Sequence, residues 1–128
     1  MGATTFEDVR IELEAAIESP PTDEAGRVRF MRLVLASVLA VPSATRATAL
    51  HEAQPVNFPS PKGDCIAAFT SAEAAEVTRN YAPFVIAIDG TTLVRQMSPE
   101  FGLAIASQKG VAVLDADFLA KVREGLNQ

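Results

Sequence analysis

The side chains best suited to catalysis are scarce in this sequence. His51 is the only histidine, so a Ser-His-Asp or Cys-His pair would have to use it. It stands between Leu50 and Glu52, in the stretch with the least recognisable secondary structure. Cys65, the only cysteine, begins an apolar run, where a thiol usually packs as a small, inert hydrophobe. We therefore expect no catalytic nucleophile and base.

Acidic residues suggest a second kind of chemistry, the binding of a cation. Asp115 and Asp117 stand two residues apart, as the first ligands of an EF-hand loop do. That loop would need a glycine at its sixth position, where this chain has Ala120. Capping of a final helix is the simpler explanation for both aspartates. We expect no metal site and no cofactor.

Four polar residues stand at the ends of expected strands: Asp64, Thr70, Asp89 and Ser107. If they converge, they could hold a small molecule such as an amino acid or another metabolite. A sensor, or a small enzyme without a metal, is therefore an alternative hypothesis for this chain. Its chemistry would be limited to carboxylates, hydroxyls and lysines.

Charge is unevenly distributed along the chain. The first 24 residues hold seven acids against Arg10, a net charge of −6, whereas the rest hold nine acids and ten bases, a net of +1. The total of −5 argues against binding of nucleic acid. Between Ala25 and Leu50 there are no acids, but there are four arginines: Arg27, Arg29, Arg32 and Arg46.

Two interpretations of these arginines remain open. In the first, Glu7, Glu14 and Glu18 of an expected first helix pair with arginines of the second helix as solvated surface charges. In the second, Arg29, Arg32 and Arg46 belong to an interaction surface for a protein partner or for self-association. A non-enzymatic interaction or adaptor module is our leading hypothesis.

Length and hydropathy predict one soluble domain over residues 1–128. A chain of 128 residues can bury enough surface to fold without a disulfide or a metal ion. No apolar run approaches the roughly 18 residues that cross a membrane. Residues Met1–Glu18 carry acids where a secretory signal would carry basic residues. A single cysteine is typical of a protein in a reducing compartment. We expect a cytoplasmic protein with no membrane partner.

Apolar spacing predicts two helices at the N-terminal end. The first runs to about Glu18 and is closed by the Pro-Pro linker of Ser19–Asp23, so residues 1–26 form an extra acidic helix and linker. The second begins near Asp23, which can act as its N-cap. Apolar residues cover more than half of the second helical wheel, which predicts a central helix.

The remaining segments alternate between short strands and helices. We expect strands at Val38–Val41, ended by Pro42, and at Phe84–Ile88. Two hairpins should pair Cys65–Phe69 with Ala53–Phe58 and Gly102–Ala106 with Val111–Leu114. Helices are expected at Ser71–Asn80, at Thr92–Met97 and after Asp115 or Asp117. Residues Ser43–Pro61 have no clear pattern. The predicted fold is α+β, in α/β layers: an N-terminal helical pair packed on a mixed sheet of about five short strands, with further helices.

Two segments resemble the N-terminal domain of the SseB, or enhanced serine sensitivity, family of bacterial proteins. The helix of Arg27–Ser37 running into Val38-Leu39-Ala40-Val41-Pro42 is similar to the family's helix and strand before its first loop. The run Ala68-Phe69-Thr70-Ser71-x-Glu73 is similar to its most recognisable motif, a strand entering a capped helix. The resemblance covers about residues 27–126.

The resemblance implies a bacterial, cytoplasmic, non-enzymatic protein, connected by name with serine sensitivity or with secretion. It supplies no catalytic residues. The chain departs from the family at Ser107-Gln108-Lys109-Gly110, where many relatives carry an Asn-Pro-Gly-like turn. Any function that depends on that turn does not carry over to this chain.

Overall fold

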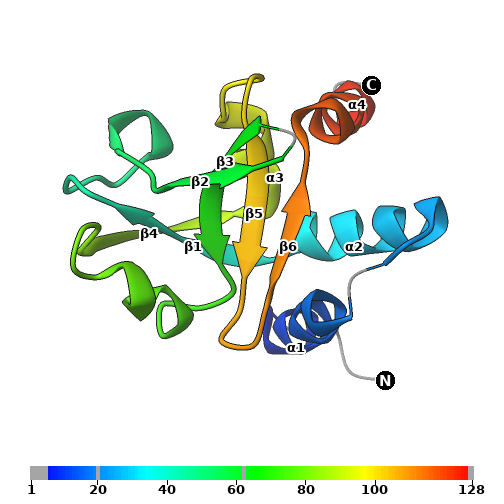
Figure 1. Ribbon diagram of the computed structural model, residues 1–128, viewed down its shortest axis with the longest axis horizontal. Coiled ribbons are helices and arrows are strands. Elements are labelled where there is room, and N and C mark those ends of the chain that lie inside the picture. The colour runs from blue at the N-terminus through cyan, green and yellow to red at the C-terminus, as the bar shows by residue number, and fades with distance from the viewer. Residues whose placement is uncertain (1–5, 20, 62, 127–128) are drawn as a thin grey trace.

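The computed structural model describes residues 6–19, 21–61 and 63–126, which form four α-helices and a mixed six-stranded sheet (Figure 1). The α-helices are α1 (Phe6–Glu18), α2 (Glu24–Ala36), α3 (Gly90–Gln96) and α4 (Ala116–Leu126). The strands are β1 (Val38–Ser43), β2 (Asn57–Ser60), β3 (Gly63–Phe69), β4 (Phe84–Asp89), β5 (Gly102–Ala106) and β6 (Val111–Leu114). Two short 3-10 helices are η1 (Leu50–Glu52) and η2 (Ala74–Thr78). The predicted α+β class is confirmed, and each strand forms in or beside a segment where one was expected, which makes six strands rather than about five.

The sheet runs in the order β4-β1-β3-β5-β6, and β2 pairs with the first half of β3. Strands β3 and β5 are parallel, with Cys65 opposite Gly102, and the other pairs are antiparallel. The hairpin of β5 and β6 has the predicted bounds. Strands β4 and β6 form the two edges of the sheet.

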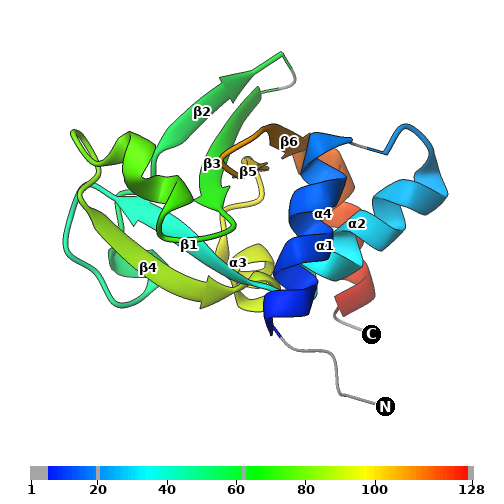
Figure 2. The ribbon, with the colours of Figure 1, turned by 90° about the horizontal axis from the view of Figure 1, so that it is seen from below.

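The two faces of the sheet bury different kinds of side chain. Successive residues of a strand point to opposite faces, so Leu103 and Ile105 of β5 join the main core with residues from all four helices. On the other face Ala67 and Phe69 of β3 pack against the small residues of η2. Figure 2 shows α1, α2 and α4 gathered beside one another. Any surface between helices therefore lies on one side of the sheet.

The N-terminal helical pair forms where the sequence predicts it. Helix α1 ends at Glu18 and α2 begins at Glu24, with the Asp23 carboxylate accepting a 2.9 Å hydrogen bond from the Gly26 N–H. Phe30 and Val34 of α2 are buried, and Leu13 of α1 joins the same core. Helix α2 packs against α1 and α3, but it is less central than the sequence predicts, because Val28 and its arginines stay exposed.

Strand β1 continues through Pro42, where we expected it to end. The Gly90 N–H donates to Ser37 O, and from there every second residue of β1 bonds β4. Pro42 falls between these bonded positions, so its imide nitrogen points away from β4 and toward β3. Strand β1 pairs with β3 at Ala40. The N–H of Ala67 in β3 donates to Val56 O rather than to β1. Pro42 therefore stands where the backbone of β3 has turned from β1 toward the segment that leads into β2, so the β1–β3 ladder does not require its N–H.

The predicted helix over Ser71–Asn80 is wrong, because only the 3-10 helix η2 forms there. The Thr70 hydroxyl, placed to cap a helix here, donates to Glu14 of α1, and the Ser71 hydroxyl accepts from the Ala74 N–H at 3.1 Å. The small side chains of Ala74 and Ala75 keep η2 close against the sheet. That tertiary contact outweighs the helical pattern of the sequence.

Residues Ser43–Pro61 are organised largely by one buried hydroxyl. Ser43 Oγ donates to Thr45 O at 2.6 Å and accepts from the N–H groups of Thr45 and Gln54, at 3.2 and 3.0 Å. The predicted hairpin with β3 is present but shifted: its first strand is β2, Asn57–Ser60, rather than Ala53–Phe58. Gly63, with φ of 121°, supplies the left-handed residue that begins β3.

Helix α3 begins two residues before the expected Thr92. Asp89 acts as its N-cap, with the carboxylate accepting from the Thr92 N–H at 3.0 Å and from its hydroxyl at 2.7 Å. Gly90 lies so close to α2 that an added Cβ would overlap the carbonyl of Val34. A glycine is required there because two backbones meet.

Candidate functional site

Helices α2 and α4 border an open hollow with a volume of about 750 Å³. We call it the α2–α4 groove. Its α2 wall is lined by Thr22, Glu24, Arg27, Val28, Met31, Arg32 and Leu35, and its α4 wall by Phe118, Lys121, Val122, Gly125 and Leu126. On each helix these residues recur every three or four positions, so each wall is one helical face.

The floor of the groove is apolar and incompletely covered. Val28 is 42% exposed although it belongs to the apolar part of α2. Phe118, Val122 and Leu126 are only partly buried against the core. At Gly125 an added Cβ would have no atom within 4 Å, so the α4 wall is open at that point. Helix α2 is therefore more apolar than its own fold requires.

Cations border this apolar floor on both sides. Arg27 and Arg32 stand on the α2 wall, Lys121 stands on the α4 wall, and all three side chains are exposed. Within residues 6–19, 21–61 and 63–126 none of the three forms an ion pair. Glu24 is the single acid of the lining, so the groove carries a net charge of +2. Its potential favours a negatively charged occupant.

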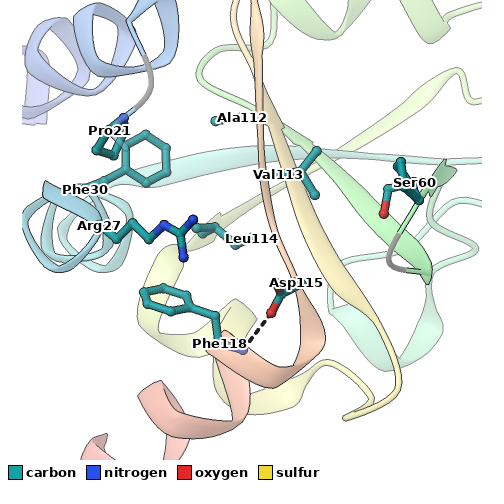
Figure 3. A pocket seen from close by; sticks show the side chains of 10 residues that line it. Pro21, Arg27, Phe30, Ser60, Ala112, Val113, Leu114, Asp115 and Phe118 are labelled. Carbon is teal, nitrogen blue, oxygen red and sulfur yellow. Dashed lines mark hydrogen bonds between the residues drawn. The ribbon is translucent and has the colours of Figure 1, made fainter. Parts of the chain in front are cut away.

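A second, smaller hollow of about 330 Å³ continues from the groove toward the edge strand β6 (Figure 3). Arg27 and Phe118 line both hollows. Figure 3 shows the Arg27 guanidinium extending from α2 toward Leu114 of β6, while the Asp115 carboxylate accepts from the Phe118 N–H at 2.8 Å. Asp115 is thus the N-cap of α4, one of the two caps that we considered.

The predicted interaction residues Arg29, Arg32 and Arg46 lie in different surroundings. Arg32 borders the α2–α4 groove, while Arg29 is exposed on α2 but outside its lining. Arg46 lies beyond β1, with its guanidinium carbon 5.5 Å from the centre of the Phe84 ring. A strand of six residues, about 20 Å long, separates it from α2. Arg46 therefore does not share a surface with the other two.

The predicted pairing of α1 glutamates with α2 arginines is absent from the described residues. Glu14 accepts a 2.7 Å hydrogen bond from the Thr70 hydroxyl, and Glu18 lies 3.6 Å from the Lys109 ammonium. The side chain of Glu7 lies outside the described part of the chain. Helix α1 packs against α2 and β6, but the side of α1 that carries Glu14 and Glu18 faces Thr70 and the turn between β5 and β6 rather than the arginines of α2.

The four strand-end polar residues are divided between the two ends of the sheet. Thr70, Asp89 and Ser107 follow β3, β4 and β5, which run in the same direction and end together, whereas Asp64 lies at the opposite end. Asp64 stands at the start of β3 and Thr70 just after its end, about 20 Å apart for six residues of strand. Thr70 is committed to Glu14, and Asp89 caps α3. The Thr92 hydroxyl, and then the Thr92 N–H, hold the pKa of Asp89 below its usual value. The site required by the small-molecule hypothesis is not assembled.

The two residues best suited to catalysis lie in different elements of the fold. His51 is exposed in η1, and Cys65 is buried in β3 with its thiol 3.9 Å from Ser60 Oγ. Among the described residues, no three His, Cys, Asp or Glu side chains are grouped so that they could hold a metal ion. None of the described helices is both long and apolar enough to cross a membrane.

Comparison with known proteins adds no relative. No protein family, no curated protein and no solved structure matches this chain.

Reasoning from the sequence missed most of the groove. The α4 wall, with Lys121 and Gly125, lies about 90 residues from α2 along the chain, and no local pattern connects the two. A signal was present in α2, because its apolar surface was too wide for a helix with one buried face. The wide stripe was a sign of an uncovered surface as much as of a central helix.

Proposed function

We propose that this chain is a non-enzymatic protein-interaction module that docks an acidic, amphipathic helix of its partner in the α2–α4 groove. The observation that carries the proposal is the apolar floor bordered by cations that have no ion-pair partner among the described residues, Arg27, Arg32 and Lys121. A groove between two helices suits a third helix, whose apolar residues recur every three or four positions.

The dimensions of the groove support a helical occupant. The α2 wall extends from Glu24 to Leu35, which is about 16 Å or three helical turns. Exposed Val28 and partly buried Phe118 and Leu126 would contact the apolar side of that helix. Carboxylates at its borders would meet Arg32 and Lys121.

The resemblance to the SseB family agrees with this proposal, because it implies an intracellular bacterial protein without catalysis. Family membership, a cytoplasmic location and any link to serine sensitivity or secretion are part of the proposal. The rival hypothesis of a metabolite sensor or small enzyme loses support, since Asp64 lies at the other end of β3 from Thr70, and the side chains of Thr70 and Asp89 bond Glu14 and α3.

A designed peptide tests the proposal directly. The probe is a stapled helix of about 14 residues, four turns, with leucines on one side and glutamates along both borders. Fluorescence anisotropy should show saturable binding to the protein, weakened at least about tenfold when lysines replace the glutamates.

A matched pair of variants locates the binding. Gly125→Trp fills the groove from a position whose Cβ direction is open, whereas Ala120→Trp places the same ring elsewhere on the exposed surface of α4. Binding should be lost in the first variant and kept in the second. Equal binding to both, or no saturable binding, would overturn the proposal.

A further inference from the structure

The outer side of α1 carries a short apolar stripe that no other described part of the chain covers. Ile11 is 56% exposed, and the exposed Ala15 lies one turn further along. Both lie away from the side of α1 on which Leu13 and Ile17 are buried. An exposed isoleucine at the centre of a helical face is a contact feature when its surroundings match a surface elsewhere.

Carboxylates border this stripe on both sides. At 100° per residue, Asp8 and Glu12 fall on one border of the line through Ile11 and Ala15, and Glu18 falls on the other. Glu18 remains 46% exposed even beside Lys109. The outer side of α1 is thus an acidic amphipathic helix face already held in helical form.

This face complements the α2–α4 groove in length, hydropathy and charge. From Asp8 to Glu18 it extends about 15 Å, against about 16 Å for the groove wall. Its apolar centre matches the floor around Val28, and its acidic borders match the cations on both walls. These are the properties that the proposed function requires of an occupant.

We propose that α1 of one copy of this chain docks in the α2–α4 groove of a second copy. The inference rests on the proposed function of the groove and names its occupant. A copy cannot close the contact on itself, because its own α1 is fixed beside β6 by the buried Leu13 and Ile17. The contact joins two different surfaces, so each copy offers one donor helix and one groove.

Sedimentation velocity over about 10 µM to about 1 mM tests this self-association at the concentrations where weak contacts saturate. The mean mass should rise above the 13.6 kDa of one chain, and high salt should reduce the rise. Ile11→Lys removes the donor face and Gly125→Trp blocks the groove. Each variant should be folded by circular dichroism and should sediment as a monomer. Val77→Lys changes a residue that is 75% exposed outside both surfaces and should associate like the wild type.

Mixing the two monomeric variants gives the sharpest test. The Ile11→Lys copy keeps an intact groove and the Gly125→Trp copy keeps an intact α1, so an equimolar mixture should form a two-chain complex. A mixture that stays monomeric, or a wild type that never associates, overturns the inference. If the wild type stays monomeric but the acidic peptide binds the groove, the proposed function survives and the occupant comes from another protein.

Discussion

The two sides of helix α2 differ in how completely they are closed. On the α1 side Leu13 is fully buried, and the Glu14 carboxylate is joined to a Thr70 hydroxyl that is itself only 3% exposed. On the α4 side Val28 stays exposed, and Arg32 and Lys121 have no ion pair within the described residues. Both sides combine apolar and charged residues, so composition alone does not distinguish them.

The difference separates residues that stabilise the fold from residues that can bind. A buried carboxylate contributes only when a donor meets it, and Thr70 is that donor for Glu14. Apolar surface left open, with cations that have no internal partner, contributes little to the fold. The α1 side should therefore respond to mutation through stability, and the α4 side through binding.

The largest expected effect is on the packing of α1. Leu13→Ala should lower the free energy of unfolding by about 2–5 kcal/mol, because it removes a fully buried side chain and leaves a cavity. Val28→Ala, on the open side, should cost less than about 1 kcal/mol. Urea unfolding monitored by circular dichroism measures both. Equal losses would mean that the groove is closed in solution.

A smaller effect is expected at the buried hydrogen bond. Thr70→Val should cost about 1–3 kcal/mol by leaving the half-buried Glu14 carboxylate without its donor. The double variant with Glu14→Leu should recover part of that loss, as a double-mutant cycle would show. Lys109→Ala breaks the exposed contact to Glu18 and should change stability by less than about 0.5 kcal/mol. Additive losses at Thr70 and Glu14 would show that the two side chains are not coupled.

The smallest effect concerns Asp89, an exposed carboxylate that stabilises through its hydrogen bonds to α3. Asp89→Ala should cost about 1 kcal/mol at neutral pH, the usual value of an N-cap. Because folding lowers the pKa of Asp89, its charge stabilises the fold above the unfolded pKa of about 3.9. That contribution is lost as the pH falls through the lowered pKa.

Carboxyl NMR titration measures this pKa directly. Thr92→Val removes the larger of the two causes, the hydroxyl bond, and should raise the pKa of Asp89 toward its usual value. The stability difference between wild type and Asp89→Ala should also narrow below about pH 4. An unchanged pKa in Thr92→Val would assign the shift to the remaining causes, the backbone N–H groups of Thr92 and Asp89 and the charge of Arg95.

Segments governed by local rules were predictable. The end of α1, the start of α2, the bounds of β5 and β6, and the cap Asp23 follow from apolar spacing and from side chains that accept backbone N–H groups, while Asp115 was one of two expected caps. Errors occurred where a distant partner changed a local preference. Thr70 turned from capping a helix to bonding Glu14, and Pro42 was accepted inside a strand because β3 bonds Val56 beside it.

The sequence by itself determined the class of the fold, the position of most elements, the unequal distribution of charge and the excess apolar surface of α2. These are set by residues within a few positions of one another, where spacing and capping act directly. Only the tertiary structure decided that α4 stands across from α2, that the α1 carboxylates meet Thr70 and Lys109, and that Arg32 borders an apolar groove while Arg46 does not. Each of those outcomes depends on where separate elements pack on the sheet, and no local pattern in the chain contains that information.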